Sequence, residues 1–98
     1  MREIELMGRK YRIKEMTYGE VLEFIENASK TIVTPTGEVK QIVNYAGSGL
    51  TLIRLCVEVE DGGRYRSMSD EEIRKLPGNV GMKLVDECFT VNNFLRQT

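Results

Sequence analysis

The sequence predicts an α+β fold, mainly α, in which an N-terminal β-hairpin packs on a small helical bundle of about four helices. Three observations support this prediction. Residues 1–15 alternate between apolar and charged side chains, as strands with one buried face do. Capping boxes at Thr17 and Ser69 mark helix starts, and the end of the chain is apolar at the helical period. We expect a single domain, residues 1–98, with a helical region in residues 16–98.

The hairpin is expected to turn at Gly8-Arg9, because glycine in the first central position suits a type II′ turn. This turn would pair residues whose numbers sum to 17. Apolar pairs then share one face and opposite charges share the other. A slip by one residue would mix the two sets, so the pattern specifies the register. The expected facing pairs are Ile4 with Ile13, Leu6 with Tyr11, Glu3 with Lys14, and Glu5 with Arg12.

The first helix is expected to begin at a capping box formed by Thr17 and Glu20. Met16 and Val21 flank this box in the positions of a hydrophobic staple. At about 100° per residue, one face of the helix is apolar and the other is acidic, so we expect the helix to pack through one side. The apolar face contains Tyr18, Val21, Leu22, Ile25 and Ala28.

Residues 31–46 have two interpretations. Apolar residues recur at helical spacing from residue 39, which favours a helix, whereas Thr34-Pro35-Thr36-Gly37 could be the turn of a second small hairpin. We favour the helix. Beyond an interruption at Gly47-Ser48-Gly49, Ser48 can cap a helix from Leu50 that is apolar on most sides and therefore belongs at the centre of a bundle. Residues 57–60 alternate as a strand does, so this helix can give way to an extended piece.

The last part of the chain predicts a short helix and then a long one. Ser69 and Glu72 form the second capping box, and Pro77-Gly78 ends that helix. The final helix is expected from Asn79 to about Arg96, with two apolar stripes. The first stripe contains Val80, Leu84, Cys88, Val91 and Leu95, and the second contains Met82, Val85 and Phe89.

Two stripes indicate two neighbours for the final helix. Both neighbours can lie within the bundle, which is the simpler explanation on packing grounds. The alternative hypothesis is that Met82, Val85 and Phe89 bind a partner protein, since methionine adapts its shape to irregular surfaces.

Composition argues against several classes of function. The chain carries 14 Lys and Arg against 15 Asp and Glu, whereas nucleic-acid binding usually requires a clear basic excess. It contains no histidine, and Cys56 and Cys88 lie 32 residues apart, so we expect no metal, no cofactor and no enzymatic activity. No signal peptide and no apolar run of about 18 residues is found, which predicts a cytoplasmic protein without a membrane span.

Three segments carry a resemblance to a known family. They are residues 2–17 (REIELMGRKYRIKEMT), Asp61-Gly62-Gly63-Arg64 followed by residues 67–72 (SMSDEE), and residues 76–81 (LPGNVG). Together they resemble the small tail assembly chaperones of long-tailed bacteriophages, over nearly the whole chain. The resemblance implies a protein without enzymatic activity that binds the tape-measure protein in the host bacterial cytoplasm. Such a chaperone helps tube subunits gather and is absent from the mature virion.

The resemblance also implies that a longer form can exist. Members of this family are often extended by ribosomal slippage before the stop codon, and the added segment recruits the tail tube protein. Asn93-Phe94-Leu95 permits a slippery heptamer if its codons are AAT TTT TTA. The alternative function is a small cytoplasmic adaptor for protein–protein interactions unrelated to tail assembly. The sequence leaves open whether the chain forms homo-oligomers.

Overall fold

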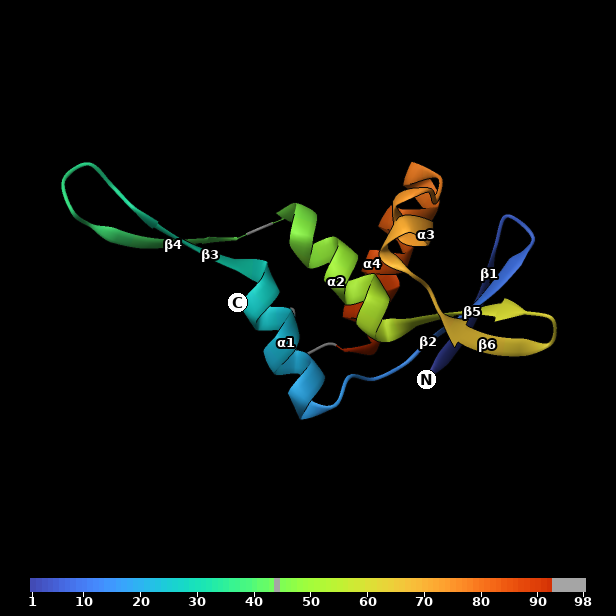
Figure 1. Ribbon diagram of the computed structural model, residues 1–98. Helices are drawn as coiled ribbons and strands as arrows, with labels where there is room; N and C mark the ends of the chain where they lie inside the picture. The colour runs from blue at the N-terminus through green and yellow to red at the C-terminus, as the bar shows by residue number, and fades with distance from the viewer. Residues whose placement is uncertain (44, 93–98) are drawn as a thin grey trace.

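Among the residues that the structure describes, the fold combines a four-stranded and a two-stranded antiparallel sheet with four helices, and this confirms the α+β class (Figure 1). The computed structural model describes residues 1–43 and 45–92, and within these it describes the side chains outside 29–32 and 40–47. Strands occur within residues 16–98, so this region is not only helical. In chain order the elements are β1 (Arg2–Leu6), β2 (Arg9–Ile13), α1 (Tyr18–Ala28), β3 (Ser29–Val33), β4 (Val39–Val43), α2 (Tyr45–Cys56), β5 (Val57–Asp61), β6 (Arg64–Ser67), α3 (Asp70–Arg74) and α4 (Gly78–Val91).

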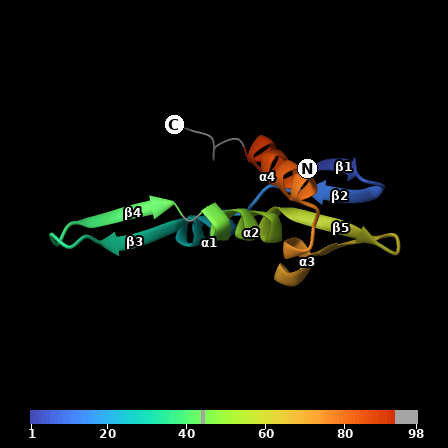
Figure 2. The ribbon, with the colours of Figure 1, turned by 90° about the horizontal axis from the view of Figure 1, so that it is seen from above.

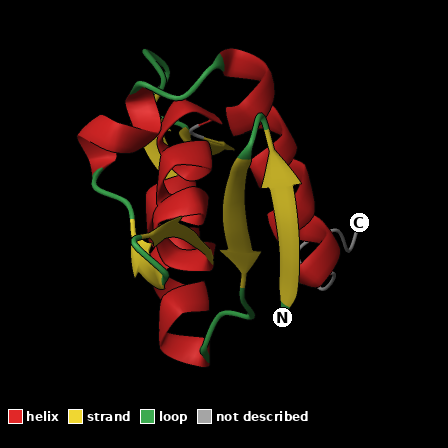
Figure 3. Cartoon of the chain, turned by 90° about the vertical axis from the view of Figure 1, so that its right-hand side faces the viewer, coloured by secondary structure: helices red, strands yellow, loops and turns green. Residues whose placement is uncertain are grey.

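The N-terminal hairpin is one half of a four-stranded sheet with the order β1-β2-β5-β6. β2 and β5 are the central strands, and each alternates between the two faces of the sheet. The face toward the helices buries Tyr11 and Ile13 from β2 and Val57 and Val59 from β5. Viewed from the sheet end, the strands lie in front of the helices (Figure 3). The extended piece expected at residues 57–60 is confirmed as part of β5.

The register expected for β1 and β2 is wrong by two residues. The turn lies at Met7-Gly8, with φ angles of 50° and 76°, so facing numbers sum to 15. Two central residues with positive φ match the twist of the strands, as in a type I′ turn. A shift of two leaves every side chain on its expected face, because the period of a strand is two. The observed pairs are Arg2 with Ile13, Glu3 with Arg12, Ile4 with Tyr11, Glu5 with Lys10, and Leu6 with Arg9.

Arg12 consequently lies at the centre of a charged row on the outer face of the sheet. Its guanidinium is 3.5 Å from a carboxylate oxygen of Glu3 and 4.0 Å from one of Glu58. The same group lies over the ring of Tyr65, 4.0 Å from its centroid. The expected pair of Glu5 with Arg12 is therefore replaced by contacts to two other carboxylates and an aromatic ring.

A second hairpin forms where we favoured a helix. Residues 29–43 contain β3 and β4, which pair with each other and extend away from the helices (Figures 1 and 2). We call them the arm. The turn holds Thr34 and Glu38 together, with the Thr34 N–H donating to the Glu38 carbonyl at 2.8 Å, and Gly37 has a φ of 86°. Turn chemistry and β-branched residues thus outweigh the helical spacing, and the alternative interpretation is confirmed.

α2 is the helix that α1, α3 and α4 all contact, as its apolar composition predicts. It begins at Tyr45, so Gly47, Ser48 and Gly49 lie inside it and the expected cap at Ser48 is wrong. A Cβ atom added to Gly49 would lie 3.8 Å from Val85 Cγ2, which marks where α2 approaches α4. The buried residues of α2 include Leu52, Ile53, Leu55 and Cys56.

Both capping boxes are confirmed. Thr17 and Glu20 exchange hydrogen bonds of 2.9 and 3.2 Å before α1, and Ser69 and Glu72 exchange bonds of 3.0 and 3.2 Å before α3. α3 is short, as expected, and α4 follows after Pro77. The end expected for the final helix, near Arg96, lies outside the described residues, as does Asn93-Phe94-Leu95.

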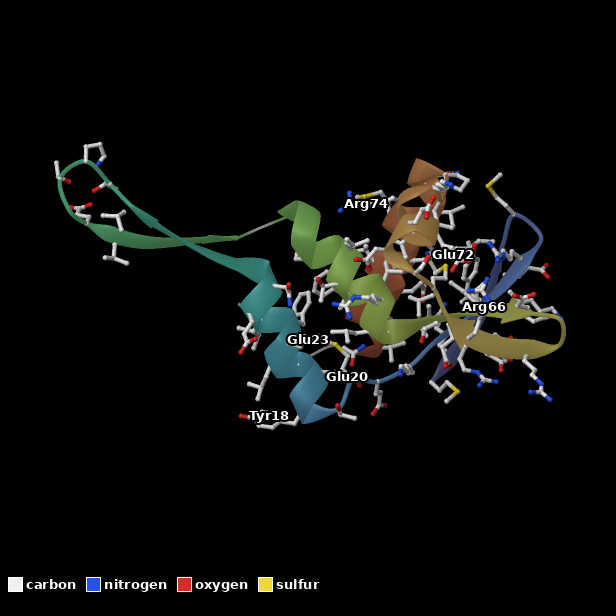
Figure 4. The ribbon with its side chains drawn as sticks, in the orientation of Figure 1. Tyr18, Glu20, Glu23, Arg66, Glu72 and Arg74 are labelled. Carbon is white, nitrogen blue, oxygen red and sulfur yellow. The ribbon has the colours of Figure 1, made fainter. Side chains whose placement is uncertain are left out.

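The second capping box also connects α3 to the sheet. Arg66 on β6 donates to both carboxylate oxygens of Glu72, at 2.9 and 2.7 Å (Figure 4). These hydrogen bonds, followed by the one from the Ser69 N–H, lower the pKa of Glu72 from 4.5 to about 2.

The lowered pKa of Glu72 predicts a specific loss of stability in acid. Because the folded-state pKa lies below the unfolded value, the carboxylate stabilises the fold above about pH 4.5, and this contribution is lost as the pH falls toward 2. In urea titrations across this range, Glu72→Gln should therefore show a smaller decline in unfolding free energy than the unmodified chain. Equal declines in the two proteins would contradict this role.

Candidate partner-binding surface

α1 has an apolar sector that is wider than its contact with the rest of the fold. At about 100° per residue, the sector from Phe24 to Leu22 covers roughly 160° of the helix. Phe24 is buried, and Val21 and Ala28 pack partly against the core. Tyr18, Leu22 and Ile25 are instead 78 %, 43 % and 50 % exposed. The apolar face expected from the sequence is therefore divided, and only one half of it packs inside the chain.

The exposed half forms a continuous line along the helix. Tyr18, Leu22 and Ile25 follow the spacing i, i+4 and i+7, which places them on one side over about two turns. We call these three residues the α1 stripe. Tyr18 is the first residue of α1, and its side chain points away from the other helices (Figure 4).

The charges beside the α1 stripe are acidic. α1 contains Glu20, Glu23 and Glu26 and no lysine or arginine. Glu20 lies 3.8 Å from the ammonium of Lys14, and Glu23 lies 3.8 Å from the guanidinium of Arg54. Glu26 is exposed and lies next to Leu22 around the helix, so the stripe has a carboxylate along one border.

The arm also exposes apolar side chains. Val33 and Val39 face each other across β3 and β4 beside the turn, and both are exposed. A two-stranded hairpin is marginally stable by itself, and this one extends away from the helices (Figure 1). The arm is therefore a second place where a partner would add contacts that the chain lacks.

The stripes predicted on the final helix have different outcomes. Val80, Leu84 and Cys88 of the first stripe are buried, in agreement with the sequence. In the second stripe Met82 is 72 % exposed, whereas Val85 and Phe89 pack partly against the core. The structure thus does not present Met82, Val85 and Phe89 as one exposed surface, and their contact with a partner stays a prediction.

Sequence reasoning missed a buried carboxylate on α4. Glu87 is buried among apolar side chains, and its oxygens lie 2.9 Å from Nε of Arg2 and 3.2 Å from Nζ of Lys83. Lys83 is four residues before Glu87, a spacing that the sequence does show. The contact with Arg2 depends on tertiary structure and ties β1 to α4.

Cys56 and Cys88 are both buried and do not form a disulfide. The pKa of the Cys88 thiol is raised above its ordinary value by a hydrogen bond with Cys56 and by burial. Because the thiolate is the reactive form, Cys88 is a poor nucleophile in the folded chain. Within the described ranges 1–43 and 45–92, no group of three His, Cys, Asp or Glu side chains could hold a metal ion.

The comparisons with known proteins give no identification. No family model, no curated protein and no solved structure matched the chain. In the part of the chain that the structure describes, none of the helices has the length and apolar character that crossing a membrane requires. Among the described residues, exposed large apolar side chains lie on the N-terminal hairpin, α1, the arm and α4.

Proposed function

We propose that the chain is a tail assembly chaperone of long-tailed bacteriophages, which binds the tape-measure protein and promotes assembly of the tail tube. The resemblance of residues 2–17, 61–64, 67–72 and 76–81 to that family supports the proposal. The proposed protein has no enzymatic activity, acts in the host cytoplasm and is absent from the mature virion. A longer form would recruit the tail tube protein.

The observation that carries the proposal is the set of large apolar side chains left exposed on α1, the arm and α4. The molecule is elongated, with extents of 55 × 26 × 20 Å along its principal axes. Exposed apolar residues that cluster on one element usually mark a protein interface, whereas single exposed apolar residues are ordinary. The exposed residues are Tyr18, Leu22 and Ile25 on α1, Val33 and Val39 on the arm, and Met82 on α4.

The proposal extends to the arrangement of the helices. In it α1, α3 and α4 form a small bundle around α2, and this bundle holds α1 with its outer side facing the client. A rigid helix that presents an apolar line needs little ordering on binding, which favours affinity.

Coexpression tests the proposed function. The tape-measure protein encoded in the same genome should remain in the supernatant and copurify when it is expressed with this chain. It should be insoluble when expressed alone, because its long helices then expose apolar faces. A tape-measure protein that stays insoluble with the chain, or that does not copurify, would contradict the proposal and leave a different adaptor function.

A further inference from the structure

We infer that the α1 stripe is the docking site for an amphipathic helix whose apolar face is bordered by lysine or arginine. The chemistry of this partner is inferred from α1 itself. That the helix belongs to a tape-measure protein rests on the proposed function.

The spacing of the α1 stripe fits a helical partner. Residues at i, i+4 and i+7 present a straight apolar line that a second helix can cover along its own apolar line, as in helix pairs generally. From Tyr18 to Ile25 the line extends over about 10 Å at 1.5 Å per residue. Phe24, which is buried, and Val21, which is partly buried, pack α1 against the core, so the exposed line is held in place before binding.

The charges around the α1 stripe select a basic partner. Glu26 is exposed beside Leu22, and Glu15 is exposed two residues before the cap of α1. Glu20 and Glu23 lie farther around the helix and are paired with Lys14 and Arg54. Glu26 is therefore the carboxylate on α1 that borders the stripe, and α1 itself has no lysine or arginine. Lysine or arginine beside the partner's apolar face would meet these carboxylates, and opposite charges across an interface set the choice of partner.

The same charges argue against a second copy of this chain as the occupant. Two α1 helices packed through their stripes would bring Glu26 of each copy toward the acidic border of the other. Like charges placed together across an interface disfavour that pairing. A partner with basic borders meets no such repulsion.

Two synthetic helical peptides test the inference with the full chain. Both carry leucine at the same i, i+3, i+4 and i+7 positions, and the borders are lysine and arginine in one peptide and glutamate in the other. Calorimetry should show tighter binding of the basic peptide. The double variant Leu22→Ser/Ile25→Ser should weaken that binding about tenfold or more, since two apolar contacts are lost. Glu26→Lys should reduce the preference for the basic peptide. Met7→Ser, at an exposed methionine in the β1–β2 turn, is the control that should leave binding unchanged.

Circular dichroism and thermal melts should show that all three variants keep the fold, because each replaced side chain is exposed. Equal affinity for the two peptides would overturn the inference. So would unchanged binding by Leu22→Ser/Ile25→Ser, or self-association of the chain that this variant abolishes.

Copurification separates this inference from the proposed function. If the unmodified chain and Leu22→Ser/Ile25→Ser both copurify equally with the tape-measure protein, the docking site is wrong and the function stands. If the basic peptide binds through the α1 stripe but the unmodified chain does not copurify with the tape-measure protein, the docking site stands and the proposed function fails.

Discussion

Replacing Ile13 by alanine should lower the free energy of unfolding by about 2 to 4 kcal/mol. Ile13 is 0 % exposed and lies on β2, opposite Val57 of β5, where the sheet meets the helices. The substitution removes buried methyl and methylene groups and leaves a cavity that a strand paired on both sides cannot close. Urea unfolding followed by circular dichroism measures the loss.

Ile4 provides the matched control for Ile13. It lies on the edge strand β1 with its side chain on the same face, but it is only partly buried. Ile4→Ala should therefore cost clearly less than Ile13→Ala. A loss below about 0.5 kcal/mol for Ile13→Ala, the size of a surface change, would show that the sheet does not form the core described here.

Replacing Asn92 by leucine should cost about 2 to 4 kcal/mol, since each buried polar group left without a partner costs roughly 1 to 3 kcal/mol. Asn92 ends α4 and is 2 % exposed. Its Oδ1 accepts from the Met16 N–H at 2.9 Å, and its Nδ2 donates to the Lys14 carbonyl at 3.3 Å. A third bond reaches the Cys88 carbonyl at 3.1 Å. Leucine would leave the backbone groups of Lys14 and Met16 without these partners.

Asn27 on α1 is the control for Asn92. It is exposed and donates to the Glu23 carbonyl within its own helix at 2.8 Å. Asn27→Leu should cost clearly less than Asn92→Leu, because Asn27 is exposed and solvent can replace the bonds that its side chain makes. Similar losses of unfolding free energy in the two variants would mean that the hydrogen bonds of Asn92 to Lys14 and Met16 do not stabilise the fold.

The helix starts could be predicted because their chemistry is local. Thr17 and Glu20, or Ser69 and Glu72, satisfy backbone groups within three residues of each other, and no distant contact alters this. The two faces of the N-terminal hairpin could be predicted for the same reason. Its register could not, since registers two residues apart keep the same faces and differ only in the turn.

Tertiary contacts decide what the sequence could not. The apolar residues of the arm fit a helix or a hairpin equally well in their spacing, and pairing with a second strand settles the choice. On α1, the residues Tyr18, Leu22 and Ile25 share a sector with Phe24, and only the position of α2 determines which of them are buried. The burial of Glu87 and Asn92 likewise depends on elements far away in the chain.

An NMR titration of the isotope-labelled chain with a tape-measure segment tests the central claim most directly. The methyl signals of Leu22 and Ile25 report on the α1 stripe, and that of Met82 reports on the surface predicted from the sequence. We expect the largest shifts at Leu22 and Ile25, with the Ile13 and Leu84 methyls in the core unchanged. Shifts that concentrate at the methyls of Met82 and Val85 and leave those of Leu22 and Ile25 unchanged would contradict the account.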